Sequence, residues 1–301
     1  MAKGKVVQSD AKKVALIRGA LRLFAWLPLS VGRALGSAMM KFGKLTNSRA
    51  YRTTKTNIET CLPELTDKQQ QELINKSLQS TGSLFAEVAK TWVKPQSIQW
   101  VDNIYGLEQV SASLQNGKGV LFTGAHVGNW EVALYFLGDQ FTFNCMYRPP
   151  RQLEMDEVIS KGRSQNETKM LRGDLKGVMQ MIKALKQGEV AALLSDQEPG
   201  RKSGIYVPFF GKKALTMNLV QKMQQKSGAE LYQIAAIRNQ QGRFDIYMEP
   251  IKIDVEQDEK SYAEQINLTL EAMIKRFPEQ YQWSYKRFKS TEDGSPNIYK
   301  K

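Results

Sequence analysis

Short apolar runs alternate with longer helical patterns through the second half of this 301-residue chain. The short runs are rich in Val, Ile, Leu and Phe and are bounded by polar residues or glycine, which is typical of buried strands. Between them, apolar residues recur every three or four positions, as they do on one face of a helix. We expect strands at 120–123, 141–147, 190–195, 231–237 and 244–248, and helices near 130–138, 151–170, 176–187, 214–227 and 259–277.

This alternation predicts an α/β fold with a mixed, mainly parallel central sheet that is flanked by helices. Gly188 and Gly228 are suited to ending two of the helices. Upstream of the sheet, Thr66 and Gln69 have the spacing of a capping box, which predicts a helix over about 67–79. A further helical pattern covers 83–92. No repeat or linker interrupts the rest, so we expect a single domain over 46–301.

Residues 1–45 have a different pattern. They are rich in apolar side chains, but Arg18, Arg22 and Arg33 interrupt them, and no stretch reaches the roughly 20 apolar residues that span a membrane. Pro28 divides the segment. We expect two amphipathic helices that lie in a lipid interface, with their arginines toward the headgroups. A helical hairpin that packs on the core of a soluble protein is the alternative.

Charge narrows the range of partners. The chain has 43 Lys and Arg against 30 Asp and Glu, a net charge of +13, which favours an anionic partner. Nucleic acid, an anionic membrane, an acidic carrier protein and a phosphorylated substrate all fit that charge. Cys61 and Cys145 are far apart, which suggests a reducing compartment, and with a single histidine a zinc site is not expected.

The only histidine, His126, lies between an expected strand and an expected helix. In such sheets the reactive groups gather beyond the carboxyl ends of the strands. Glu131 follows five residues later, so we predict His126 as a general base and Glu131 as the carboxylate that orients it. Backbone N–H groups near Gly128 and Asn129 would favour developing negative charge at the helix start. A histidine that only packs against this turn is the alternative.

Two more strand ends carry polar residues that should lie at the same edge of the sheet. Arg148 follows the strand predicted at 141–147, where its guanidinium would clamp a phosphate or carboxylate. Asp196 and Gln197 follow the strand predicted next along the chain. Arg163 belongs to a positive stretch between these two strands. We predict that the substrate is bound by five residues: Asn129, Arg148, Arg163, Asp196 and Gln197. An ordinary solvated face is the alternative for these basic residues.

Together these short sequence motifs resemble those of the late acyltransferases of lipid A biosynthesis, the lauroyl and myristoyl transferase family of Gram-negative bacteria. The resemblance covers most of the chain and rests on six short boxes in the family's order. The boxes are Asn57–Glu72, His126–Glu131, Tyr147–Pro149, Asp196–Gln197, Val207–Thr216 and Pro278–Trp283. Two positions depart from the family's pattern. Ala125 replaces a frequent Gly, and Tyr285 stands where many members have His.

The resemblance implies a sheet-and-helix fold like that of glycerolipid acyltransferases, at the cytoplasmic face of the inner membrane. It implies transfer of a fatty acyl chain from acyl carrier protein to a hydroxyl of a lipid A precursor, with no cofactor. His126 and Glu131 match the family's catalytic pair, and Arg148 matches the arginine that holds the lipid. Asp196 matches the third box. No Ser or Cys is paired with the histidine in a motif, so no covalent enzyme intermediate is expected.

Three alternatives stay open at this point. One is an acceptor of another class, because relatives acylate ornithine lipids or other glycolipids. A nucleic-acid-binding protein would use the same positive charge, but no recognised module is present and the apolar N-terminus does not suit it. A membrane-surface scaffold without catalysis would not need His126 and Glu131. We therefore expect acyl carrier protein, a lipid A precursor and the anionic inner-membrane surface as partners, and no nucleic acid.

Overall fold

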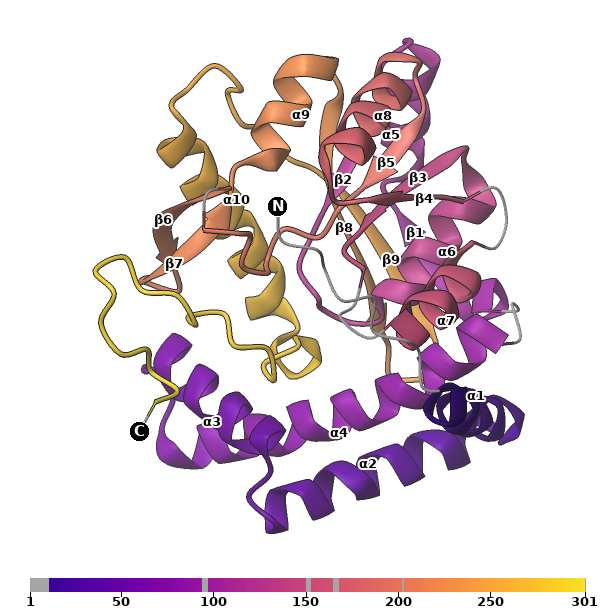
Figure 1. Ribbon diagram of the computed structural model, residues 1–301, viewed down its shortest axis with the longest axis vertical. Helices are drawn as coiled ribbons and strands as arrows, with labels where there is room; N and C mark the ends of the chain where they lie inside the picture. The colour runs from indigo at the N-terminus through magenta and orange to yellow at the C-terminus, as the bar shows by residue number, and fades with distance from the viewer. Residues whose placement is uncertain (1–10, 94–96, 150–152, 165–167, 202, 301) are drawn as a thin grey trace.

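A computed structural model describes residues 11–93, 97–149, 153–164, 168–201 and 203–300 (Figure 1). The central sheet is mixed and mainly parallel, as predicted. Among the strands described, the one antiparallel pair in this sheet is β8 and β9, and β1 pairs with β9 in parallel. Across the sheet the strands are β1 (Val101–Tyr105), β9 (Phe244–Pro250), β8 (Glu230–Arg238), β2 (Val120–Thr123), β5 (Val190–Ala192), β3 (Phe143–Tyr147) and β4 (Lys169–Arg172).

Helices cover both faces of this sheet, so its central strands are apolar on both sides. In β2, Leu121 packs into one core cluster, while Val120 and Phe122 point the opposite way into the other. This is the continuous apolar pattern expected of a buried parallel strand. The helices around the sheet are α5 (Leu107–Gln115), α6 (Trp130–Gln140), α7 (Leu153–Arg163), α8 (Leu175–Lys186), α9 (Leu219–Ser227) and α10 (Glu259–Arg276), with short 3₁₀ turns at Ser97–Trp100 and Pro278–Gln280.

The N-terminal segment forms a helical layer along one end of the molecule (Figure 1). Pro28 separates its first two helices, as expected, and the capping box at Thr66 and Gln69 is present. The two helical patterns that follow this box belong to one continuous helix. Gly36 and Gly82 let two of these helices touch, because a Cβ on Gly36 would lie 2.0 Å from the Gly82 carbonyl oxygen. The layer comprises α1 (Ala11–Trp26), α2 (Leu29–Leu45), α3 (Arg49–Cys61) and α4 (Asp67–Val93).

The prediction that arginines of this layer face lipid headgroups is wrong for Arg33. Its guanidinium points inward, where Nε donates to Glu87 Oε1 at 2.7 Å. Arg18 is paired with Glu157 of α7. A buried carboxylate outcompetes water for Arg33, because that carboxylate would otherwise be an unpaired charge in the interior. Among the described residues, no helix has the length and apolarity to cross a membrane.

Two segments differ from the predicted secondary structure. The helix expected over 214–227 is only α9, because its first residues form β7 (Lys212–Met217) in an antiparallel hairpin with β6 (Gly204–Phe209). Ala214, Leu215 and Thr216 are all buried, and such a run does not distinguish a strand from a buried helix. The helix expected over 151–170 ends at Arg163, and β4 begins at Lys169; residues 150–152 and 165–167 lie outside the described part.

Candidate active site

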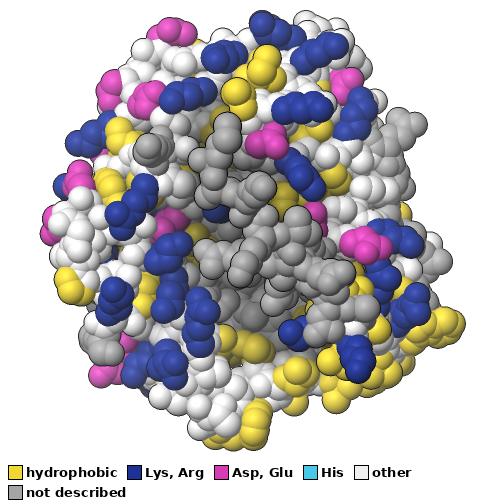
Figure 2. All heavy atoms as spheres, viewed as in Figure 1, with side chains coloured by type: hydrophobic (Ala, Val, Ile, Leu, Met, Phe, Trp, Pro, Cys, Tyr) yellow, Lys and Arg dark blue, Asp and Glu magenta, His cyan; other side chains and the backbone are white. Residues whose placement is uncertain are grey.

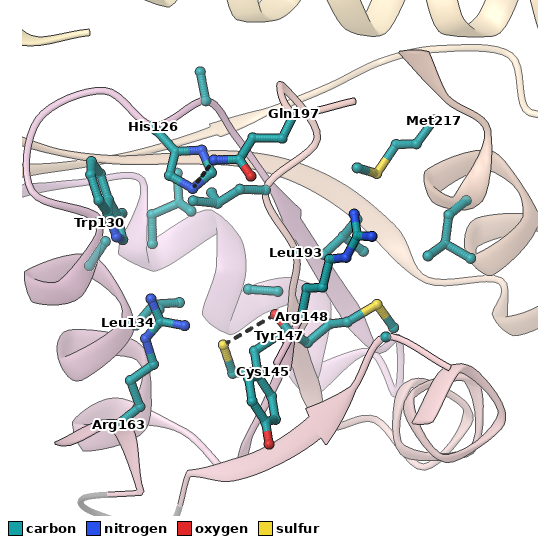
Figure 3. A pocket seen from close by; sticks show the side chains of 18 of the residues that line it. His126, Trp130, Leu134, Cys145, Tyr147, Arg148, Arg163, Leu193, Gln197 and Met217 are labelled. Atoms are coloured by element: carbon teal, nitrogen blue, oxygen red, sulfur yellow. Dashed lines mark hydrogen bonds between the residues drawn. The ribbon is translucent and has the colours of Figure 1, made fainter. Parts of the chain in front are cut away.

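Three strand ends meet around one cavity of about 350 Å³ at the carboxyl edge of the sheet. His126 follows β2, Gln197 follows β5 and Arg148 follows β3, and all three side chains line the cavity. These strands are neighbours in the order β2-β5-β3. Gln197 therefore reaches Nε2 of His126, although the two residues are 71 positions apart in the sequence. Figure 3 shows His126 and Gln197 side by side, with Arg148 reaching in from β3.

The imidazole of His126 is held by a buried carboxylate. Asp196 Oδ1 lies 2.6 Å from Nδ1 of the ring, and Oδ2 accepts from the backbone N–H of His126 at 2.9 Å. Burial opposes ionisation of Asp196, but the charge and hydrogen bonds of His126 outweigh it and lower the pKa of Asp196. An ionised carboxylate only accepts, so Nδ1 carries the proton when the ring is neutral, and Nε2 then keeps its lone pair. Gln197 Nε2 approaches that nitrogen at 3.3 Å.

The turn that carries His126 is clamped from two sides. Gly128 has φ +65°, and a Cβ there would lie 2.0 Å from the Ala236 carbonyl oxygen of β8. On the other side, the carbonyl of Gln280 accepts from the Gly128 N–H at 3.0 Å, and the Gln282 N–H donates to the His126 carbonyl at 2.9 Å. The segment after α10, where the sequence has its last box, therefore fixes the backbone of the turn that carries His126.

Glu131 does not orient His126, contrary to the sequence-based prediction. Arg163 donates to both of its carboxylate oxygens, from Nε to Oε2 at 2.9 Å and from Nη2 to Oε1. The indole N–H of Trp92 also donates to Oε2, at 2.9 Å. Because Glu131 sits in the first turn of α6, its side chain projects toward α4 and α7 rather than back over the turn. Burial opposes its ionisation, but Arg163 and the indole donors lower the pKa of Glu131.

A link from Glu131 to the imidazole runs through Trp130. The Trp130 indole N–H donates to Glu131 Oε1 at 3.0 Å, and its ring meets the His126 ring edge-on with centroids 4.8 Å apart. Glu131 thus holds the indole ring of Trp130, against which the imidazole packs. Arg163, predicted as a substrate contact, does line the cavity, while its guanidinium is bound to Glu131.

Asn129 lies in the interior, and it is not among the residues that line the cavity. Its predicted contact with a substrate is therefore corrected. The side-chain oxygen caps α6 by accepting from the N–H groups of Glu131 and Val132. Its amide nitrogen donates to Glu87 Oε2 at 3.1 Å, and Arg238 also donates to Glu87. Sequence reasoning missed Glu87, because a charge on a long helix usually marks a solvated face.

The inner part of the cavity is apolar. Leu134, Leu193 and Ile234 line it, together with the Cys145 thiol. Burial raises the pKa of Cys145 to about 12, so the group is a neutral thiol and a poor nucleophile near neutral pH. The nearby Ser195 hydroxyl is fully buried and bonded to Thr123. Among the described residues that line the cavity, the imidazole thus stands beside an apolar wall and is not paired with a Ser or Cys.

Comparison with known proteins identifies the family. The model of the bacterial lipid A biosynthesis acyltransferase family matches residues 7–290. The chain belongs to this family. Among its relatives is the lipid A biosynthesis lauroyltransferase of Escherichia coli K12, 30% identical over 93% of this chain and 92% of the relative. The palmitoleoyltransferase of the same organism is 27% identical over the same shares, and its myristoyltransferase is 23% identical over 89% and 82%.

Acid should destabilise this family member steeply through three buried carboxylates. Burial opposes ionisation of Glu87, Glu131 and Asp196, yet their cationic and hydrogen-bonding partners lower the pKa of each. Their contribution to stability is thus complete above the ordinary carboxyl pKa, about 4, and is lost as the pH falls through the lower folded-state pKa. Urea unfolding between pH 7 and pH 3 should show a falling free energy of unfolding.

The matched variant for this measurement is Glu87→Gln. It should cost about 3–5 kcal/mol at pH 7, because Arg33 and Arg238 lose their buried partner. Its dependence on pH should also be shallower than that of the unaltered chain. Parallel curves for the two proteins would show that Glu87 does not contribute to the acid sensitivity.

Proposed function

We propose that this protein transfers a fatty acyl chain from acyl carrier protein to a hydroxyl of a lipid A precursor, at the cytoplasmic face of the inner membrane. Membership of the lipid A acyltransferase family supports the reaction class. The observation that carries the proposal is His126, whose Nδ1 is held by a buried carboxylate while the ring lines a largely apolar cavity. No cofactor takes part in this chemistry.

In the proposed reaction, Nε2 of His126 removes the proton of the acceptor hydroxyl. The alkoxide oxygen attacks the thioester carbonyl, and the Gln197 amide beside the base donates to the developing oxyanion. Collapse of the tetrahedral intermediate breaks the carbon–sulfur bond, and the carrier thiolate takes the proton from the imidazolium. Asp196 stabilises that imidazolium and keeps the ring in the required tautomer.

The two substrates have different chemistry, and the cavity offers a place for each. Apolar side chains line its interior, which suits a hydrocarbon chain. At the rim, Arg148 is exposed, and no described residue forms an ion pair with it. A guanidinium that is free at the rim suits a phosphate of the acceptor, which it can bind bidentately.

Mass spectrometry of lipids after incubation with acyl carriers of defined chain length tests the function. We expect a product heavier than the lipid A precursor by one acyl group, with free carrier thiol released in equal amount. Removing the phosphates of the acceptor should slow transfer, because Arg148 loses its partner. Acylation of an ornithine lipid in preference to the precursor would contradict the proposed acceptor, and no transfer to any hydroxyl would contradict the reaction.

Chain length should change when the cavity is made shallower. Ala133 on α6 is buried and lines the cavity, so Ala133→Met adds volume where the hydrocarbon would lie. The preferred donor should become shorter by about two to four carbons, since each displaced methylene is worth about 0.8 kcal/mol. The exposed substitution Ala112→Met on α5 is the matched control. An unchanged chain-length profile in Ala133→Met would place the acyl chain elsewhere.

We also propose that α1 and α2 bind the membrane surface. Val31, Leu35, Met39 and Phe42 of α2 are all exposed, and at about 100° per residue they share one face of the helix. Trp26 at the end of α1 is 73% exposed. Figure 2 shows apolar side chains along this lower edge of the molecule. A contiguous exposed apolar face next to basic residues is typical of a helix that lies in the lipid interface.

Met39→Glu should weaken that binding. Met39 and Leu268 are each 62% exposed, so Leu268→Glu on α10 makes the same kind of change on a different surface. Burial of a Met side chain is worth about 1.5–3 kcal/mol, which predicts a roughly tenfold or greater loss of partitioning. Sedimentation with phosphatidylethanolamine–phosphatidylglycerol vesicles measures it. Equal losses in both variants would show that α2 is not the membrane-binding surface.

A further inference from the structure

The outer face of α8 combines positive charge with exposed apolar side chains. Leu175 and Met179 are 77% and 63% exposed. Lys176, Lys183 and Lys186 are exposed beside them. At about 100° per residue, all five positions fall within an arc of roughly 100° on the helix. We call these five residues the α8 face.

The α8 face is not needed to hold the fold together. The opposite side of the helix supplies the packing, where Met181, Ala184 and Leu185 are buried. No described acidic side chain forms an ion pair with the three lysines of the α8 face. The carboxylates nearest in the sequence have other partners: Asp174 accepts from the Gly177 N–H as the cap of the helix, and Glu189 pairs with Lys169. The positive charge is therefore uncompensated within the described part of the molecule.

The α8 face begins at the entrance to the active site. Gly173, two residues before the helix, lines the same cavity as His126. Because α8 follows β4, it starts at the carboxyl edge of the sheet, where the cavity opens. Its first turn, with Leu175 and Lys176, thus stands beside the route by which a donor would enter.

This surface lies far from the proposed membrane-binding helices. In Figure 1, α8 is at the top of the molecule, whereas α1 and α2 form its lower end. Figure 2 shows Lys and Arg side chains at the top as well as along the sides, while the lower edge is mainly apolar. A flat membrane that contacts α2 cannot also contact the α8 face. The partner of the α8 face must therefore arrive from the aqueous side.

We propose that the α8 face docks an acidic protein that delivers the acyl thioester to the cavity. The inference rests on the proposed function, and it adds the surface that recognises the donor. Lysines around a small apolar centre fit a partner that presents carboxylates around apolar side chains of its own. The lipid acceptor then enters from the membrane side, and the protein-bound donor enters from the opposite side. Added salt should weaken the contact, because exposed charges are screened.

The test compares two donors with the double variant Lys176→Glu/Lys183→Glu in the full chain. One donor is the acyl group on acyl carrier protein, and the other is the same acyl group on pantetheine, which has no protein surface. We expect the KM for the protein-bound donor to rise about tenfold or more, while KM and kcat for acyl-pantetheine stay unchanged. Leu175→Ser should raise the KM for the protein-bound donor in the same selective way.

The matched control is Lys68→Glu/Lys260→Glu, which makes the same change in net charge on exposed positions of α4 and α10. Equal KM values for the protein-bound donor in the two double variants would overturn the proposal. A parallel rise for both donors would overturn it too, since the α8 face would then act on the cavity itself. So would loss of binding to phosphatidylglycerol vesicles with donor kinetics unchanged. Absence of transfer from either donor in the unaltered chain would instead overturn the proposed function.

Discussion

Replacing His126 by Asn should lower kcat by at least about 10²–10⁴-fold, the usual contribution of a general base. Asn is chosen because its amide can still donate to Asp196, where Nδ1 of the ring lies 2.6 Å away. The buried carboxylate thus keeps a partner, while the acceptor of protons at Nε2 is lost. The variant should therefore stay folded, with a melting temperature close to that of the unaltered chain. Steady-state transfer from acyl carrier protein to the lipid precursor measures the loss.

The control for this experiment is Arg148→Met, a change at the rim of the same cavity. It should raise the KM for a phosphorylated acceptor and leave kcat largely intact. A folded His126→Asn protein with full kcat would remove the base from the mechanism. A rise in KM with an unchanged kcat would also remove it, because a base acts in the transition state and not in binding.

Much of the fold was predictable from the sequence because burial on both faces leaves a simple pattern. The run at β2 is apolar up to Thr123, and the structure buries it at the centre of the sheet. Outside the β6–β7 hairpin, the two strands that were missed lie at the edges of the sheet. β4 at one edge alternates little and is partly exposed, and β1 at the other edge is mostly exposed. Edge strands carry little of the apolar signal on which such a prediction depends.

The sequence predicted which strand ends form the candidate site. It did not predict which side chains contact one another there. His126, Arg148 and Gln197 do meet at one cavity, since parallel neighbours end at the same edge. The partner of the imidazole was misassigned, because proximity in sequence favoured Glu131 over a residue 70 positions away. A signal was available: Asp196 follows β5, the strand next to β2, so its carboxylate lies at the same sheet edge as His126.

Glu87 of α4 connects the N-terminal helices to the sheet and to the turn that carries His126. Its carboxylate accepts from Arg33 of α2 and from Arg238 at the end of β8. It also accepts from Asn129, the cap of the helix that begins directly after the turn of His126. One buried carboxylate therefore joins the helix proposed to touch lipid, the sheet and the turn of His126. The helices α2 and α4 thus share a buried charged cluster with the sheet and with the cap of α6.

Replacing Asp196 by Asn should cost about 10³–10⁴-fold in kcat. In an Asp–His contact of this kind the same change costs about 10⁴, because the amide permits the wrong tautomer of the ring. If the NH₂ group of the introduced amide faces Nδ1, that nitrogen becomes an acceptor and the ring proton moves to Nε2. As the chain has one histidine, its two ring nitrogens can be assigned directly by ¹⁵N NMR. The unaltered protein should carry the proton on Nδ1.

Glu131→Gln is the comparison that separates the two carboxylates. It should lower the free energy of unfolding by about 3–5 kcal/mol, because the Arg163 guanidinium is left without its buried counter-charge. The tautomer of His126 should nevertheless stay as it is in the unaltered protein, since Asp196 still accepts from Nδ1. If the tautomer changed in Glu131→Gln and not in Asp196→Asn, the orienting role would return to Glu131. With the reverse result, Glu131 acts through Arg163 and Trp130, and Asp196 is the residue that makes Nε2 a base.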